Sequence, residues 1–338
     1  MKKSVKISKK TGIALFVTAA VIMALLIVFH KNPGPAVDQS QELAKKIISC
    51  VVIAAACFAF IHWYDKFTGL PVELFQNRHL IWKLAKNDFK KRYAGSYLGA
   101  VWAMAQPVVT VAMYYIVFDK IMGNTSTPLR EGVEVPFVLF LTAGLVPWFY
   151  FSEALNNGTN ALLEYNYLVK KVVFKVEILP VIKLISCLFV HAFFVAIMFI
   201  VFLVSGKRPQ ISWIQIIYYS FAASMYALAL TYLTSAIQVF FKDMAQIVSI
   251  CLQFGMWLTP IMYSEQLFLD KGLTMAPMIL KLNPFYYIAA GYRDSMLTGD
   301  WFFMRPTLTV YFWAVTLITM LVGLKVFKRL RPHFSDVL

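Results

Sequence analysis

Residues 185–204 read ISCLFVHAFFVAIMFIVFLV, twenty residues that include no Asp, Glu, Lys or Arg. A run of about 20 apolar residues crosses the hydrocarbon core as a helix, because lipid offers backbone polar groups no other partners. Comparable blocks occupy residues 13–29, 47–63 and 308–324. The whole chain is 60% hydrophobic and 14% charged, whereas a soluble domain has roughly 45–50% and 25%. The sequence therefore predicts an all-α polytopic membrane protein.

Extending the same reading along the chain predicts eight spans, near residues 11–30, 47–63, 98–118, 136–155, 177–204, 211–240, 245–263 and 307–324. Lys and Arg are concentrated in the alternate connecting segments, which are residues 1–10, 64–97, 156–175, 241–244 and 325–338. The positive-inside rule places these segments, and both termini, in the cytoplasm. The net charge of +15 is then a topology signal, and it does not indicate a nucleic-acid partner.

Residues 77–93 have a helical pattern but are too polar to span. Apolar or small residues recur every four positions, at Ile81, Ala85, Phe89 and Tyr93, and lysines occupy the other faces. This pattern predicts an amphipathic helix lying on the inner leaflet, with a plain surface helix as the alternative.

Residues 264–306 form a long connection that is too apolar for a simple loop. Short interfacial or re-entrant helices would bury these side chains. The four cysteines and five histidines show no spacing typical of a metal site, so we expect no metal.

Four separated motifs carry a family resemblance. They read LAKNDFKKRYAGSYLGAVWAMAQP at residues 84–107, LTAGLVPWFYFSEALNNGTNALLEYNYLVKKVVFKVEILP at 141–180, FFKDMAQIVSICLQFGMWLTPIMYS at 240–264 and NPFYYIAAGYRDSML at 283–297. Together they resemble the permease of ABC-2 type exporters. The similarity is to the branch that exports lipid-linked polysaccharides such as O-antigen, capsule or teichoic acid.

The resemblance implies a six-span permease domain over residues 75–338, with the interface helix at 77–93, re-entrant outer helices before the last span, and a multi-pass location in a bacterial inner or plasma membrane. Residues 1–70, with two extra spans, are an N-terminal addition. The family pattern also implies a homodimer that pairs with two ABC ATPase subunits. The chain lacks a G-x-x-x-x-G-K-[ST] phosphate loop, so ATP and Mg²⁺ are expected on the partner and no cofactor on this chain.

The resemblance further implies a path for a polyprenyl-pyrophosphate-linked glycan. Aromatic faces suit the passage of sugar rings, and the candidates are Tyr114, Tyr115, Trp148, Phe149, Tyr150, Phe151, Phe254, Trp257 and Tyr263. Each of these side chains could instead belong to an interfacial aromatic belt or face the lipid. Candidates for meeting the lipid pyrophosphate and membrane lipids at the inner side are Lys91, Arg92, Glu177 and Lys183. The last two could instead reach the headgroups from the ends of spans.

Two further groups of residues follow from the same resemblance. Contact with the ATPase is expected at Glu164, Tyr165, Leu168, Val169, Lys170, Lys171, Lys242 and Asp243, against the alternative of a plain inner loop. The outer re-entrant segment is expected to include Asn283, Pro284, Phe285, Tyr286, Tyr287, Tyr292 and Arg293. We expect Arg293 to pair with Asp294 or with backbone groups of the outer segment.

Three other functions remain open from the residues alone. An ABC-2 permease could move a drug or a peptide in place of a glycan. A membrane-embedded glycan or polyprenyl-phosphate enzyme would need metal-binding carboxylates or a basic catalytic set, and no D-x-D or H-E-x-x-H spacing occurs. A passive scaffold would have no need of polar or proline residues inside its spans.

Overall fold

The computed structural model describes residues 9–29, 39–62, 64–92, 94, 99, 101–121, 123, 126–130, 132–170, 175–273 and 275–338. The chain divides into two compact units, Met1–Ile81 with Phe302–Ala314, and Trp82–Trp301 with Val315–Leu338. Each unit is described by itself. The predicted boundary between an extension at 1–70 and a permease domain at 75–338 stays a prediction.

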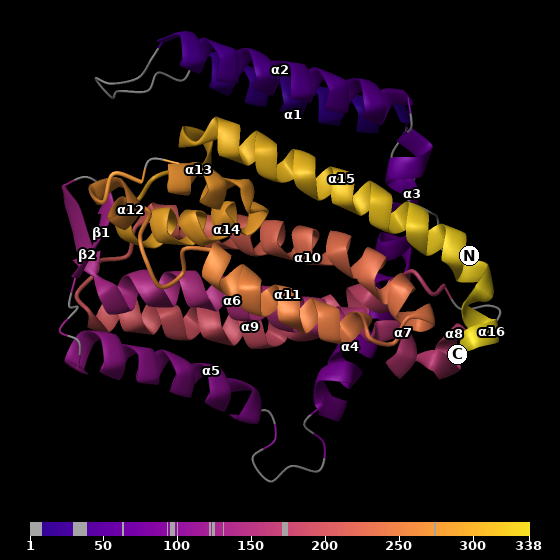
Figure 1. Cartoon of the computed structure of the whole chain (residues 1–338). Helices are drawn as coiled ribbons and strands as arrows, with labels where there is room; N and C mark the ends of the chain where they lie inside the picture. Colours follow the sequence, from indigo (N-terminus) through magenta and orange to yellow (C-terminus); the bar gives the residue numbers. More distant parts are fainter. Residues whose placement is uncertain are drawn as a thin grey trace. The chain divides into compact units, whose positions relative to one another are not determined.

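The first unit begins with a helical hairpin, which Figure 1 shows in indigo. Helices α1 (Lys9–Phe29) and α2 (Gln39–His62) pack along each other. The rings of Phe16 and Phe60 stack with their centroids 4.0 Å apart. Helix α3 (Tyr64–Gln76) follows. The unit also includes a 3-10 turn, Phe302–Met304, and the beginning of α15 (Pro306–Leu330).

The second unit contains the remaining elements. Its helices are α4 (Arg78–Arg92, from Trp82 onward), α5 (Val101–Tyr114), α6 (Phe137–Thr159), α7 (Ala161–Glu164), α8 (Asn166–Val169), α9 (Ile178–Val204), α10 (Gln215–Phe240), α11 (Met244–Leu258), α12 (Gln266–Asp270), α13 (Met275–Leu282), α14 (Pro284–Arg293), the rest of α15, and α16 (Phe334–Val337). Short π or 3-10 turns lie at Tyr115–Ile121, Ile211–Ile214, Asp294–Thr298 and Arg331–His333. An antiparallel hairpin joins β1 (Ser126–Arg130) to β2 (Val133–Pro136).

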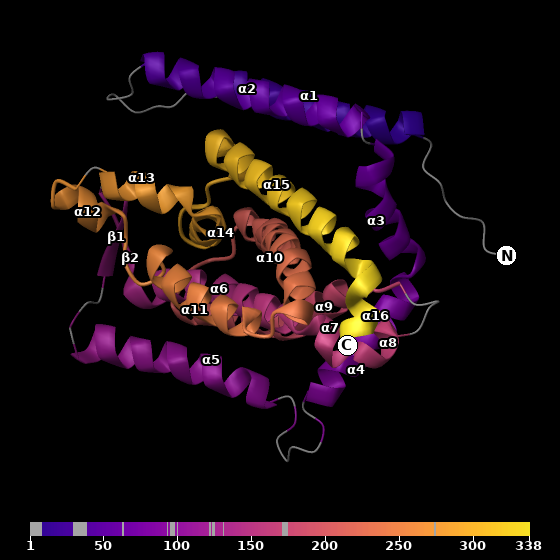
Figure 2. The same ribbon diagram turned by 45° about the vertical axis from the view of Figure 1, so that its right-hand side comes forward.

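Helix α6 is the centre of the second unit. It is buried along most of its length and packs against α9, α10, α11 and α14, an arrangement that can be followed in Figures 1 and 2. Gly158 allows the close approach of α10, because a Cβ atom at this position would lie 2.5 Å from Cγ2 of Thr231. Small residues at helix crossings bring backbones together in membrane proteins, where packing replaces the hydrophobic driving force.

We expect Gly158→Val to destabilise the protein by about 1–3 kcal/mol, the usual cost of overpacking a tight core. The reason is the contact with Thr231. Thermal unfolding of the purified protein in detergent measures the loss. Adding Thr231→Ala, which removes both of the clashing atoms, should restore much of the stability, and an equal loss in the single and double variants would contradict this explanation.

The observed helices agree with the predicted class. Within the part of the chain that the structure describes, five helices are long and apolar enough to cross a membrane, and these are Lys9–Phe29, Phe137–Thr159, Ile178–Val204, Ile211–Phe240 and Pro306–Val337. Three shorter apolar helices, Lys46–His62, Val108–Phe118 and Met244–Leu258, coincide with the other three predicted spans. An all-α polytopic membrane protein is thereby confirmed, and the count of eight spans stays a prediction.

Three details differ from the sequence-based expectations. Helix α11 ends at Leu258 and not near Tyr263, because Thr259 turns to an extended conformation just before Pro260. The β-hairpin at 126–136 was not predicted. The apolar outer connection does form short helices, α12 to α14, but their position in a membrane remains a prediction.

Candidate functional site

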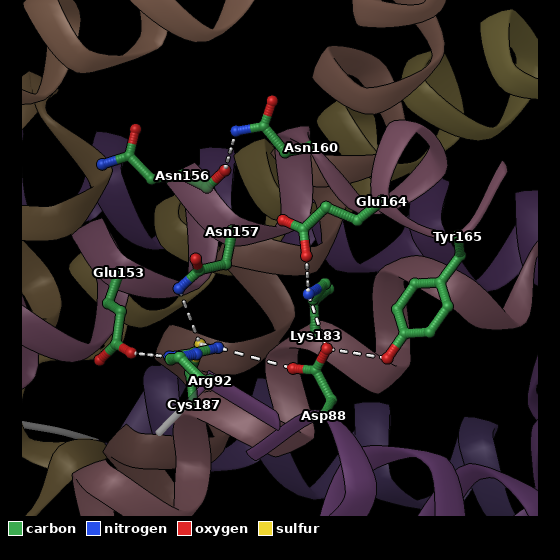
Figure 3. A network of polar contacts seen from close by, with 10 residues as sticks. All are labelled: Asp88, Arg92, Glu153, Asn156, Asn157, Asn160, Glu164, Tyr165, Lys183 and Cys187. Atoms are coloured by element: carbon green, nitrogen blue, oxygen red, sulfur yellow. Dashed lines mark hydrogen bonds and ion pairs between the residues drawn. The ribbon is translucent and has the colours of Figure 1, made fainter. Parts of the chain in front are cut away.

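A polar cluster lies where α4, α6 and α9 meet the short helix α7. We call it the inner polar cluster, because its elements adjoin segments predicted to be cytoplasmic. Its members are Asp88, Arg92, Glu153, Asn157, Glu164, Tyr165, Lys183 and Cys187 (Figure 3). Charged side chains at the ends of apolar helices are costly to bury without partners, so such a cluster is a functional candidate.

Lys183 is the centre of the cluster. Its side chain is only 4% exposed, and its Nζ donates to Oδ1 of Asp88 at 2.6 Å and to Oε2 of Glu164 at 2.5 Å. Figure 3 shows the ammonium group between the two carboxylates. Asp88 belongs to the amphipathic helix α4, Glu164 to α7, and Lys183 to α9. One buried cation thus joins three elements.

Asp88 and Tyr165 have perturbed pKa values that fit these contacts. Burial raises the pKa of the Asp88 carboxyl group, but the hydrogen bond and charge of Lys183 outweigh burial and bring the pKa below its ordinary value. Burial, followed by the bond to Asp88, raises the pKa of the Tyr165 phenol. The phenol therefore stays neutral and donates to Oδ1 of Asp88 at 2.8 Å. Because the folded pKa of Asp88 is depressed, its stabilising contribution is complete near neutral pH and falls only in acid.

The second half of the cluster joins α4 to α6. Arg92 pairs with Glu153 and lies 3.6 Å from Oδ2 of Asp88. Its guanidinium also donates to Sγ of Cys187 at 3.7 Å, and Nδ2 of Asn157 donates to the same sulfur at 3.5 Å. Three carboxylates and two basic groups are thereby combined. The arrangement can hold three helices in register, and its half-exposed member is Glu164, whose side chain is 50% exposed.

A second set of bonds extends from the cluster to the turn between α10 and α11. Nε2 of Gln238 donates to the carbonyl of Lys242 at 3.1 Å and to Oδ1 of Asn160 at 3.3 Å. The amide of Ala245 donates to Oε1 of Gln238 at 2.8 Å. Asn160 lies directly before α7. Gln238 therefore shapes the inner turn, residues Phe241–Asp243, and ties it to the start of the predicted ATPase-binding segment.

The structure separates the predicted ATPase-binding residues by exposure. We call residues Ala161–Lys170 the docking segment. Glu164 and Lys170 are exposed and Leu168 is half-buried, whereas Tyr165 and Val169 are buried and hold the segment in place. Lys242 and Asp243 are exposed at the inner turn. Lys171 lies outside the described residues.

The four residues predicted to meet a lipid pyrophosphate lie in different surroundings. Lys91 is exposed, and Arg92 and Lys183 are partnered within the inner polar cluster. Glu177 is buried and pairs with Arg331. Tyr93, which the amphipathic pattern included, lies outside the described residues, whereas its partners Ile81 and Ala85 are buried as expected.

The predicted channel aromatics divide into a packed group and an exposed group. The ring of Trp148 meets Phe285 with centroids 5.0 Å apart, and Phe151 meets Phe285 at 4.7 Å. Tyr150 is buried with a bond to Ser224 at 2.7 Å. Phe149, Tyr114, Tyr115 and Tyr263 are half-buried. Phe254 and Trp257 on α11 are 74% and 65% exposed, so the described residues leave most of both side chains uncovered.

The outer segment is organised by a buried arginine. Arg293, at the end of α14, donates to the carbonyls of Phe140 at 3.2 Å, Pro260 at 2.6 Å and Ile261 at 2.7 Å. It also stacks 3.5 Å from the centroid of the Phe140 ring. Arg293 thus pairs with backbone carbonyls, but these belong to α6 and to the residues just after α11, and not to the outer segment 264–306 or to Asp294 as expected. The bonds hold the end of α11 and the start of α6 together.

Other predicted outer residues also have defined partners. Oδ1 of Asn283 accepts from the amide of Phe285 at 3.1 Å, which caps α14, and Pro284 takes the first position of that helix. Nδ2 of Asn283 donates to Thr259 at 2.7 Å. Tyr286 and Tyr287 are buried. Tyr292 is buried as well, and its hydroxyl lies 2.6 Å from Oγ of Ser220.

Several members of the site were missed from the sequence. Asp88, Cys187 and Gln238 are not among the residues predicted for the site. The signal that could have found Asp88 is its position three residues after Ala85, on the apolar side of the helix. Tyr167, which is 48% exposed on α8, was also missed. Among the described residues, no group of His, Cys, Asp and Glu gathers to hold a metal ion.

The similarity of this chain to known proteins extends over all residues of the inner polar cluster. A family model described as ABC-2 type transporter matches residues 79–297. The O-antigen export system permease protein RfbA of Myxococcus xanthus is 26% identical over 267 residues, which are 78% of this chain and 97% of that protein. Two proteins of the same name from Klebsiella pneumoniae are 26% and 25% identical, over 75% of this chain and 93% of theirs. The family match includes every residue of the inner polar cluster.

Proposed function

Because the chain belongs to the ABC-2 type transporter family, we propose that it is the transmembrane subunit of an ATP-driven exporter of a lipid-linked polysaccharide. The observation that carries this proposal is the match to O-antigen export permeases over 93–97% of their length. A polyprenyl-pyrophosphate-linked glycan of the O-antigen, capsule or teichoic-acid type is the proposed cargo. It moves from the cytoplasmic to the outer side of a bacterial inner membrane.

ATP is hydrolysed by a separate ABC ATPase with which the permease pairs. In the complete exporter, two permeases and two ATPases assemble, and both ends of this chain lie in the cytoplasm. The docking segment and the inner turn meet the ATPases. Support comes from the exposed side chains of both elements. Lys183 links the docking segment to α4 and α9, and Gln238 links the inner turn to Asn160 at the start of the docking segment.

The glycan passes between the two permeases. The exposed face of α11, with Phe254 and Trp257, lines this path or its border, since aromatic faces stack on sugar rings and hold no fixed charge against the polymer. The lipid pyrophosphate meets the basic end of α4, where Lys91 is exposed and can bind phosphate. Lys183 acts there through its positive charge more than as a direct ligand of the pyrophosphate, because its ammonium group already donates hydrogen bonds to two carboxylates.

The export of a drug or peptide is the rival within the same family. Glycan export and drug or peptide export can be distinguished by depleting the protein in its host. Sugars are then labelled with a membrane-impermeant reagent, on intact and on opened cells. We expect lipid-linked glycan to accumulate on the inside only. Unchanged surface glycan together with normal lipid-linked pools would contradict the proposal and favour the rival.

The docking segment gives a more local prediction. Tyr167→Ala should weaken ATPase binding about tenfold or more, because exposed aromatic residues dominate many protein interfaces. The affinity can be measured between permease in nanodiscs and the purified ATPase. Tyr263→Ala, which alters an aromatic residue of the outer side, is the matched control. Equal affinities for wild type and Tyr167→Ala would remove the docking role from this residue.

A further inference from the structure

The last eight residues of the chain hold one buried anchor in an exposed stretch. Phe334, on α16, is 1% exposed, whereas Arg331, Pro332, His333, Ser335 and Asp336 are exposed. The ring of Phe334 lies 6.0 Å from Phe240 and 5.3 Å from Phe327. Phe240 is the final residue of α10, directly before the inner turn. A tail that served only to lead the chain away from the membrane would have no need of this buried aromatic contact.

A second contact ties the same tail to the beginning of α9. The guanidinium of Arg331 pairs with Oε1 of Glu177. The carbonyl of Glu177 accepts from the hydroxyl of Tyr232 at 2.9 Å, and the ring of Tyr232 meets Phe327 at 5.4 Å. Glu177 is 6% exposed, so it relies on this partner. The Arg331 side chain is 45% exposed, so its removal would leave the buried Glu177 as the charge without this partner.

One of these contacts reaches the border of the inner turn, and the other reaches Glu177, seven residues after the end of the docking segment. Glu177 comes directly before α9, on the side of the chain that leads back to the docking segment. Phe240 comes directly before the inner turn. Gln238 connects the inner turn to Asn160 at the start of the docking segment. The inner turn is therefore held on one flank by the bonds of Gln238 to Lys242 and Asn160, and its preceding residue Phe240 is held by the ring of Phe334.

We propose that Arg331 and Phe334 in the C-terminal tail form a positioning element for ATPase binding, which sets the relative placement of the inner turn and the start of α9. This inference rests on the proposed pairing with an ABC ATPase. It assigns no direct ATPase contact to Phe334. The buried ring acts through Phe240 and the turn that follows it, and Arg331 acts through Glu177.

The test measures ATPase affinity and permease stability in the same variants. The partner ABC ATPase is identified by its phosphate-loop sequence, and the permease in nanodiscs is titrated with it. Thermal unfolding of each permease variant is recorded in a separate measurement. Phe334→Ala is expected to weaken ATPase binding about tenfold, with the unfolding midpoint of the spanning helices little changed. Val337→Ala, which alters an exposed tail residue, is the matched control and should bind like wild type.

The ion pair supplies an independent variant set. Arg331→Glu should weaken binding to a similar extent, because two carboxylates would then face each other. Combining it with Glu177→Lys restores opposite charges and should recover at least half of the lost affinity. Wild-type affinity in both Phe334→Ala and Arg331→Glu would overturn the positioning role. A wild-type permease that binds no ABC ATPase at all would instead contradict the proposed function.

Discussion

Lys183→Met is expected to lower the free energy of unfolding by about 2–4 kcal/mol and to reduce ATP-driven export at least tenfold, since breaking a buried ion pair on one side costs about 3–5 kcal/mol. The Asp88 carboxylate, which accepts the 2.6 Å bond from Lys183, would lose its nearest cation. The bond that links Glu164 on α7 to α9 would be lost as well. Thermal unfolding in detergent and export in proteoliposomes measure the two effects.

A second substitution separates the two consequences. Asp88→Asn in the Lys183→Met background removes the charge that has lost its nearest cation, so stability should largely recover. Export should stay low, because the connection between Glu164 and α9 is still missing. Lys281→Met is the matched control, since Lys281 pairs with Glu265 at 3.0 Å in an exposed setting, where an ion pair contributes about 0–1 kcal/mol. Recovery of export together with stability would show that the cluster acts only on folding.

Arg293→Gln is expected to destabilise the outer end of the permease more than any other single change considered above. Arg293 satisfies the carbonyls of Phe140, Pro260 and Ile261. Each buried carbonyl left without a donor costs about 1–3 kcal/mol, so we expect a loss of about 3–5 kcal/mol in total. Thermal unfolding should show it, and protease cleavage between α11 and α12 should become faster.

The space around Arg293 provides the control for this prediction. A Cβ atom at position 144 would lie 2.7 Å from Nη2 of Arg293, so Gly144→Ala should reproduce part of the loss. Arg293→Lys should also be less stable than the wild type, because an ammonium group cannot match three carbonyls that are arranged around a planar guanidinium. Wild-type stability in Arg293→Gln would mean that the outer segment is held by other contacts.

Features with a local cause could be predicted from the sequence. Uninterrupted apolar blocks identified α1, α6, α9, α10 and α15, because length and composition alone decide whether a helix can cross lipid. A four-residue repeat identified α4. The Asn-Pro pair at 283–284 marks the start of α14, where the asparagine caps the helix.

Contacts between distant parts of the chain could not be predicted in the same way. Asp88 and Lys183 are separated by 95 positions, as are Arg92 and Cys187. Nothing in either local pattern says which partner will be reached. Lys183 was therefore assigned to the lipid pyrophosphate from its place near a span end, whereas the structure surrounds it with carboxylates. The assignment of Lys183 to the lipid pyrophosphate stays a prediction, and the structure shows Asp88 and Glu164 as its partners within the chain.

The role of the C-terminal tail was hidden for a related reason. Phe334 follows a basic stretch whose sequence is typical of a membrane anchor. The contact of Phe334 with Phe240 arises from the fold and has no local signal in the sequence. The β-hairpin at 126–136 was missed because each strand contains a proline that weakens the strand pattern, Pro128 in the middle of β1 and Pro136 at the end of β2. Gly132 supplies the turn, with a φ of +73° that other residues rarely adopt.

Reconstitution tests the central proposal most directly. The permease and its ATPase are placed in proteoliposomes with the host's lipid-linked polysaccharide on the ATPase side, and a membrane-impermeant sugar label reports glycan that reaches the opposite side. We predict that the label appears only with ATP and that Lys183→Met nearly abolishes it. Glycan that never crosses, while a drug or a peptide crosses with ATP, would contradict the proposed export of polysaccharide.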